Sequence, residues 1–142
     1  MILPIRAYGD TVLRKKAHDI SPDYPELKEL VSNMFDTMNE AHGIGLAAPQ
    51  IGLDIRLFVV DVTPLADDED YEDIAEELKD FKKVFINAKI LEESGNEWKF
   101  NEGCLSIPDV REDVSRKETI LIEYYDENFV KHTETFSDIR AR

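Results

Sequence analysis

The chain has 142 residues, a length that suits one folded domain, here residues 1–142, able to bury roughly 70% of its accessible surface. Its composition, 42% apolar and 34% charged, excludes a disordered chain, and no stretch approaches the ~20 apolar residues of a membrane span. The net charge of −14 argues against direct nucleic-acid binding, because contacts with phosphates need clustered Lys and Arg.

The N-terminal residues indicate where the protein works. Met1 to Arg6 lack the basic start, apolar stretch and small-residue cleavage site of a signal peptide. Cys104 is the only cysteine, so no intrachain disulfide can form and an oxidising compartment is not implied. We therefore expect a cytoplasmic protein with no membrane partner.

The first long element in chain order is an amphipathic helix over residues 25–42. Asp23 is expected to cap its N-terminus, Pro25 is tolerated in the first turn, and Gly43 follows where a left-handed stop is common. Apolar residues recur at three- and four-residue steps, which predicts one face packed on a core. These residues are Leu27, Leu30, Val31, Met34, Phe35, Met38 and Ala41.

The remaining elements are predicted to be mainly strands. Residues 55–62 and 84–91 each form an apolar, β-branched run, and between them lies an acidic segment, residues 67–80, expected to be a solvated loop or short helix. Residues 119–125 and 129–136 are β-rich runs separated by a short polar loop, which predicts a hairpin. An early helix followed by mostly antiparallel strands indicates an α+β fold.

The last residues indicate the start of another helix. Ser137 is a suitable N-cap and Asp138 an acid in the first turn, yet no Gly, Asn or Pro stop precedes Arg142. A helix of about one turn is unstable by itself. We therefore expect the natural polypeptide to continue beyond Arg142.

Residues 43–50, Gly-Ile-Gly-Leu-Ala-Ala-Pro-Gln, form the first stretch with a possible role in binding. With little side-chain bulk near Gly43 and Gly45, the backbone could approach an extended peptide closely. A helix end entering a tight loop is the more ordinary interpretation. A phosphate cradle is not indicated, because the stretch follows a helix and no Lys-Ser/Thr comes after it.

Residues 102–106, Glu-Gly-Cys-Leu-Ser, form the second stretch. By itself, Cys104 is more often a buried small apolar residue than a metal ligand or a nucleophile. His18, His42 and His132 are the histidines that could join it, and no two are four residues apart, so no pair could bind one metal from a single helix face.

Together, the two stretches resemble the first and second signature motifs of peptide deformylases, complete and in the same order. The resemblance extends to the start of the chain, the helix and the last hairpin. It implies an α+β fold with an N-terminal amphipathic helix and mostly antiparallel sheets. The shorter matches are Ile2-Leu3-Pro4-Ile5, Val12-Leu13-Arg14 and Ile107-Pro108.

The resemblance also implies roles for individual residues. Cys104 would bind Fe²⁺ as a thiolate, with Zn²⁺, Ni²⁺ or Co²⁺ as substitutes. The Gln50 side-chain amide and the Leu105 backbone N–H would donate hydrogen bonds to the developing oxyanion. The residues implied to line the peptide-binding edge and the entrance to a methionine pocket are Gly43, Ile44, Gly45, Glu102 and Gly103.

The implied reaction is metal-dependent hydrolysis of the N-formyl group of formylmethionine in newly made proteins. Formyl-Met peptides and nascent chains would be the substrates, and the ribosome a transient partner. The family's third motif, a helical His-Glu-x-x-His that supplies two metal ligands and a catalytic Glu, does not occur in these 142 residues. We therefore expect residues 1–142 alone to be inactive and weak in metal binding.

Two alternatives stay open at this stage. The chain could be a short paralogue that binds peptide N-termini without catalysis. It could also be a domain completed by another copy, as a homo-oligomer or a swapped dimer that covers an apolar surface.

Overall fold

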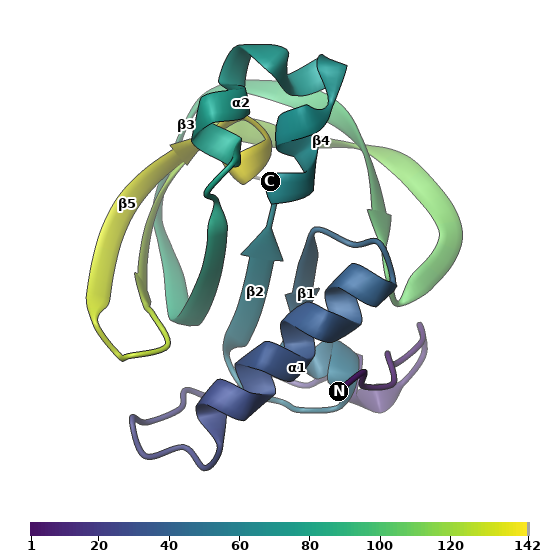
Figure 1. Cartoon of the computed structure of the whole chain (residues 1–142), viewed down its shortest axis with the longest axis vertical. Helices are drawn as coiled ribbons and strands as arrows, with labels where there is room; N and C mark the ends of the chain where they lie inside the picture. The colour runs from purple at the N-terminus through teal and green to yellow at the C-terminus, as the bar shows by residue number, and fades with distance from the viewer. Residues whose placement is uncertain (142) are drawn as a thin grey trace.

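The fold is built on a strongly curved antiparallel sheet (Figure 1). The computed structural model describes residues 1–141; Arg142, and with it the predicted chain end, lies outside the described residues, as do the side chains of Pro108 and Asp109. Within the described range the five strands are ordered β1-β2-β3-β4-β5, as in the chain. Their bounds are Gly45–Ala47, Leu57–Asp61, Lys82–Cys104, Ile107–Tyr125 and Lys131–Ser137. The predicted α+β class with antiparallel pairing is confirmed.

Helical structure is limited to two α-helices and several short 3-10 turns. The α-helices are α1, Leu27–Glu40, and α2, Ala75–Leu78. None of the helices described has both the length and the apolar character needed to cross a bilayer. The 3-10 turns are Thr11–Arg14, Ala48–Ile51, Thr63–Asp67, Glu69–Ile74 and Asp138–Ala141.

The start of α1 differs from the prediction. Asp23 does not cap the helix, because its carboxylate accepts a hydrogen bond from the Ser21 hydroxyl. The residue that precedes the helix is Glu26, which has a left-handed backbone conformation with φ of 56° and makes no side-chain cap bond. The helix therefore begins at Leu27 after a tight turn, two residues later than predicted.

The end of α1 also differs from the prediction, because the helix stops at Glu40, two residues early. The left-handed position is His42, with φ of 59°, and not Gly43. The His42 N–H donates to the Asn39 carbonyl at 3.1 Å and the Gly43 N–H to the Met38 carbonyl at 2.9 Å. This is the double hydrogen-bond pattern of a Schellman stop. It turns the chain directly into β1.

One face of the sheet is covered by α1, which crosses β1 and β2 (Figure 1). The predicted apolar stripe of α1 packs there, with Met34 and Met38 fully buried. Their neighbours in this cluster include Leu57 and Val59 of β2. This core fixes β1 against the helix and so sets the position of the first motif.

The opposite face of the sheet carries an aromatic core. Phe58 and Phe85, paired across β2 and β3, stack with ring centroids 4.7 Å apart. Tyr124 of β4 lies 4.4 Å from Phe85, and Phe136 of β5 packs edge-on against Phe81 at 5.1 Å. Offset and edge-on pairs of this kind add to the stabilisation from burial alone.

Strands β3 and β4 form a long hairpin that was predicted only in part. Residues 84–91 and 119–125 are strands as predicted, but their pairing with each other was not predicted, and it continues outward until Cys104 pairs with Ile107. This extension curves away from β2 (Figure 1). Its tip carries the second motif, so the hairpin is the element that places Cys104.

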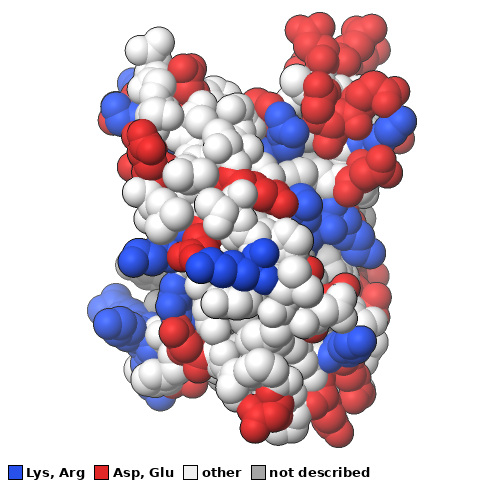
Figure 2. Space-filling model, turned by 90° about the vertical axis from the view of Figure 1, so that its left-hand side faces the viewer, with Lys and Arg blue, Asp and Glu red and all other residues white. Residues whose placement is uncertain are grey.

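The acidic segment, residues 67–80, covers one end of the sheet. It forms a 3-10 turn and α2, and it is anchored by Leu78, which is fully buried. Acidic side chains crowd at that end of the molecule (Figure 2). The predicted solvated character of the segment is confirmed.

The predicted helix start at Ser137 is wrong in its details. Ser137 is the last residue of β5, and its hydroxyl lies 3.2 Å from that of Thr119. Asp138, with φ of 58°, instead accepts the Arg140 N–H at 3.1 Å and begins a 3-10 turn. Ile139 of this turn is buried in the aromatic core.

Candidate functional site

The fold brings the ends of the two motifs together. Gln50 Nε2 lies 3.7 Å from Cys104 Sγ, although the two residues are far apart in the chain. Cys104 is exposed. The ordinary interpretation of this cysteine as a buried apolar residue is therefore wrong, and its thiol can be reached by a ligand.

The Gln50 carboxamide has a defined orientation. Its Oε1 accepts the Ala47 backbone N–H at 2.9 Å, and its Nε2 donates to Ser106 Oγ at 3.2 Å. Because the Ala47 N–H can only donate, it identifies the oxygen end of the amide. The NH₂ group is thereby directed toward Cys104, where it can stabilise negative charge.

Gln50 is placed by a 3-10 turn, Ala48–Ile51, which follows β1. Pro49 at the start of this turn has its backbone restricted to a suitable conformation, and Gly52 ends it with φ of 93°. A β-carbon at Gly52 would lie 2.9 Å from an Arg6 guanidinium nitrogen. Glycine is favoured there because of its backbone conformation, since the Arg6 side chain could move aside.

Gly43 allows the two motifs to touch through Leu105. A β-carbon at Gly43 would lie 2.7 Å from Leu105 Cδ1. Leu105 is half-buried and also contacts the core beneath α1. Its backbone lies at the hairpin tip between Cys104 and Ser106, on the same side of the molecule as Gln50.

The first motif forms strand β1 and not only the predicted tight loop. Leu46 is buried, whereas Ile44 and Gly45 are exposed. The Ile44 carbonyl accepts the N–H of Asp61, in the neighbouring strand β2, at 2.9 Å. In an antiparallel pair the backbone groups alternate in direction, so those of Gly45 face away from β2. β1 has one strand neighbour within the described residues and is an edge of the sheet.

Glu102 and Gly103 are fixed by side chains of β4. The Glu102 carboxylate accepts two hydrogen bonds from Arg116, each 3.0 Å, and this contact raises the pKa of Arg116. A β-carbon at Gly103 would lie 2.9 Å from Arg111 Nη1. The contact between Arg116 and Glu102 stiffens the hairpin next to Cys104, so Glu102 holds the hairpin as well as lying beside the site.

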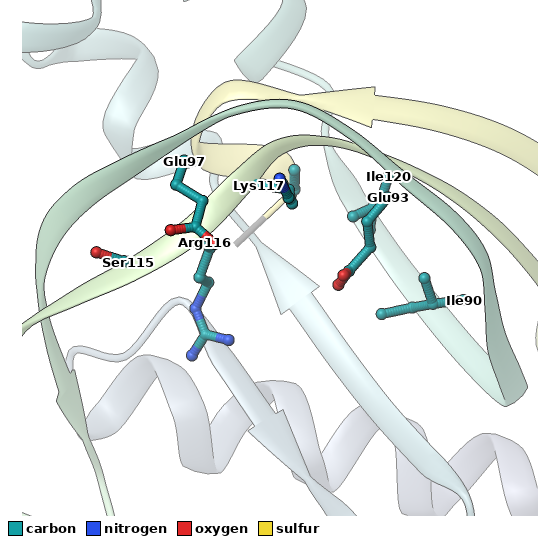
Figure 3. A pocket seen from close by; sticks show the side chains of 8 residues that line it. Ile90, Glu93, Glu97, Ser115, Arg116, Lys117 and Ile120 are labelled. Atoms are coloured by element: carbon teal, nitrogen blue, oxygen red, sulfur yellow. The ribbon is translucent and has the colours of Figure 1, made fainter.

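A cavity of about 280 Å³ lies between β3 and β4 (Figure 3). It is bordered by the charged side chains of Glu93, Glu97 and Lys117, together with Ile90 and Arg116. Neither Gln50 nor Cys104 lines it. Through Arg116, however, it adjoins the ion pair that holds Glu102.

Two groups of residues at the site were not predicted to act there. Ser106 belongs to the second motif, and its position as a small polar residue beside Cys104 could have indicated a role at the site. Arg6 and Tyr8 offered none, because they act through the backbone: the Arg6 N–H donates to the Gln50 carbonyl at 2.6 Å, and the Tyr8 N–H to the Ser106 carbonyl at 2.8 Å. The N-terminal segment thus joins both motif loops.

Cys104 suits one position in a metal site, since an exposed thiol can bind a soft or borderline cation as thiolate. The residues described here contain no group of three His, Cys, Asp or Glu side chains arranged to hold an ion. His18 lies 3.7 Å from Asp54, and His132 lies 2.8 Å from Asp126. Among the described residues, Cys104 is therefore the one side chain at the site that is suited to bind a metal ion.

Comparisons with known proteins agree with this arrangement. The sequence model of the polypeptide deformylase family matches residues 2–142. A peptide deformylase of Christiangramia forsetii is 61% identical over 100% of this chain and 73% of its own length, and one of Flavobacterium johnsoniae is 62% identical with the same coverage. The crystal structure of peptide deformylase from Thermotoga maritima has a TM-score of 0.84 and 30% identity, covering 99% of this chain and 85% of that one. A peptide deformylase from Synechococcus elongatus in complex with actinonin has a TM-score of 0.82 and 36% identity, covering 98% and 68%.

Proposed function

The chain belongs to the peptide deformylase family, and we propose that its reaction, hydrolytic removal of the formyl group from N-terminal formylmethionine, takes place where Gln50 meets Cys104. The observation that carries this proposal is the 3.7 Å contact between the Gln50 amide and the exposed Cys104 thiol. The substrates are formyl-Met peptides and nascent chains.

Gln50 acts by donating a hydrogen bond to the oxyanion that forms when the formyl carbon is attacked. The Leu105 backbone N–H at the adjacent hairpin tip is the second donor. Preorganised donors are effective because they need no rearrangement as charge develops. The bond from Ala47 to Gln50 Oε1 supplies this preorganisation for the first donor.

The peptide binds along β1 as an added strand. The outward backbone groups of Gly45 can pair with the peptide backbone, and Gly43 keeps that edge narrow. Ile44, which is 37% exposed, offers an apolar contact for the methionine side chain. Glu102 and Gly103, on the β3–β4 hairpin, are proposed to contact the same peptide.

The family is metal-dependent in general, and we assign Cys104 as a thiolate ligand. Fe²⁺ is the proposed native ion, with Zn²⁺, Ni²⁺ or Co²⁺ as substitutes, because thiolate binds such cations strongly. Replacing the sulfur in Cys104→Ser should lower the bound metal, measured by elemental analysis after purification. In the Co²⁺ form, the near-ultraviolet thiolate charge-transfer band should also disappear. A Cys104→Ser protein that keeps both the metal and the band would contradict the assignment.

The role of Gln50 is tested with Gln50→Glu, which keeps an oxygen for the Ala47 N–H and removes the amide donors. We expect kcat for a formyl-Met tripeptide to fall about 10²- to 10³-fold, the usual effect of losing an oxyanion donor. Thermal stability should change little, because the bond to Ala47 is kept. Wild-type kcat in this variant would rule out the proposed donor.

A further inference from the structure

We propose that Ser106 is a positioning residue that holds the Gln50 carboxamide in its productive orientation. The inference rests on the proposed function of Gln50 and adds a second residue to it. Ser106 lies beneath the hairpin tip and touches neither the peptide edge nor the thiol in the contacts described above. Its action is on Gln50 alone.

The burial of Ser106 is the first observation. Its exposed fraction is only 4%, which is unusual for a polar residue. A buried hydroxyl needs a hydrogen-bond partner, since leaving one unpaired is costly. The partner is Gln50 Nε2 at 3.2 Å. The hydroxyl therefore has a specific task at this place.

The second observation is how Ser106 is itself held. Its carbonyl accepts the Tyr8 N–H at 2.8 Å, while the Gln50 carbonyl accepts the Arg6 N–H at 2.6 Å. The same short N-terminal segment therefore sets the backbone of both residues. Because the two backbones are fixed relative to each other, the contact between their side chains is fixed as well.

The third observation concerns the two hydrogens of the Gln50 NH₂ group. One is taken by Ser106 Oγ, and the other is directed toward Cys104, 3.7 Å away. The last torsion of a glutamine side chain is broad and weakly restricted by itself. Without Ser106, the amide is held only at Oε1 by Ala47 and can tilt about that bond. With Ser106, the other N–H of the amide stays directed toward Cys104.

The test is Ser106→Ala in the full natural polypeptide, assayed with a formyl-Met tripeptide. We expect kcat to fall about 10-fold with KM nearly unchanged, because the lost interaction orients a donor used in the transition state. In the Gln50→Glu background the same substitution should have almost no further effect on kcat. Such non-additivity is the sign of two residues that act as a unit.

A matched control is Thr37→Ala. Thr37 is also a buried hydroxyl, bonded to the Asn33 carbonyl and the Leu3 N–H at 2.7 and 2.8 Å, away from the site. This variant should lose thermal stability while keeping kcat. If Ser106→Ala behaves like Thr37→Ala, with stability lowered and kcat unchanged, the inference is overturned.

A second readout separates this inference from the proposed function. If the full natural polypeptide does not deformylate the peptide, the proposed function fails, and the orientation of Gln50 is then judged by NMR. The side-chain amide resonances of Gln50 should be well dispersed in the wild type and move toward free-glutamine values in Ser106→Ala. Resonances that stay in place would overturn the positioning role without reference to activity.

Discussion

The site residues depend on a close fit between Gly43 and Leu105. Because a β-carbon at Gly43 would lie 2.7 Å from Leu105 Cδ1, no larger residue fits without moving that side chain. Leu105 in turn lies between Cys104 and Ser106. A change at Gly43 is therefore transmitted to the hairpin tip beside the Cys104 thiol.

Gly43→Ala should displace Leu105 and lower both stability and activity. We expect a loss of about 1–2 kcal/mol in the free energy of unfolding, the usual cost of overpacking, measured by urea denaturation. Gly45→Ala is the matched control for stability, because its β-carbon would meet only the Val59 carbonyl, at 3.7 Å. Equal losses of stability in the two variants would show that the contact with Leu105 is not the cause.

At this scale the sequence predicted the motif residues but not their connections. Gln50 and Cys104 could be selected because they lie in stretches that resemble the two signature motifs of the family. The bond between Gln50 and Ser106, and the backbone bonds of Arg6 and Tyr8, depend on how distant segments meet in space. Backbone groups are the same in every residue, so no residue type could have indicated them.

At the scale of elements, the turn between β4 and β5 is organised by one carboxylate. Asp126 Oδ1 accepts the N–H groups of Asn128 and Val130 at 2.8 and 3.1 Å, and its Oδ2 lies 2.8 Å from His132 Nε2. Burial alone would raise the pKa of Asp126, but these hydrogen bonds lower it overall. These hydrogen bonds therefore favour the ionised form of the Asp126 carboxylate.

This arrangement predicts a pH dependence. A carboxylate whose pKa is lower in the folded state stabilises the protein above its unfolded pKa, about 4, and that contribution is lost as the pH falls through the lower folded value. Asp126→Asn should therefore be less stable than wild type at pH 6, with a difference that shrinks below about pH 4. Urea unfolding at several pH values measures this.

The neighbouring Glu127 gives a control for the same turn. It is exposed, so Glu127→Gln removes an equal charge without touching the hydrogen bonds of Asp126. Its stability should follow the wild-type curve with pH. A constant difference between Asp126→Asn and wild type over the whole pH range would contradict the role given to the carboxylate.

The elements themselves were predictable where burial is one-sided. The runs 55–62, 84–91 and 119–125 were recognised because buried apolar residues mark them. The outer part of the β3–β4 hairpin was missed because both of its faces are largely exposed and carry charges, such as Glu97 paired across from Lys117. Its strands are held by backbone pairing and cross-strand contacts, so the sequence there has no periodic pattern of apolar residues that would predict a strand.

On the scale of the whole molecule, the net charge of −14 is unevenly placed. Many acids outside the acidic segment have a partner, as in Glu102 with Arg116 at 3.0 Å and Glu123 with Lys131 at 2.5 Å. Within residues 67–80, Glu76 has Lys79 at 2.6 Å, but acids outnumber bases (Figure 2). Like charges crowded on one end oppose folding. The sequence predicted the total, whereas the structure was needed to show which acids are paired.

The position of each acid within its helical turn decides whether its negative charge stabilises or destabilises the fold. Asp67 and Asp80 lie at or just beyond the C-terminal ends of short helical turns, where the helix dipole disfavours negative charge. Asp73 lies where a 3-10 turn runs directly into α2, and its charge is unfavourable because of repulsion from the neighbouring acids. Glu69 lies in the first turn of its 3-10 segment, where negative charge is favoured. All four side chains belong to exposed residues, so replacement should not disturb packing.

The triple variant Asp67→Asn, Asp73→Asn, Asp80→Asn should therefore raise the melting temperature at low ionic strength, by roughly 2–4 °C if it recovers about 1 kcal/mol. The gain should shrink above about 0.5 M NaCl, because screening then acts over only a few ångströms. Salt should likewise raise the melting temperature of the wild type more than that of the triple variant. Glu69→Gln, which removes a charge of the same sign from a favourable position, should give no gain at low salt. Calorimetric melting at both salt concentrations measures all these differences. A triple variant that melts no higher than wild type at low salt would show that repulsion in this segment does not limit the stability of the fold.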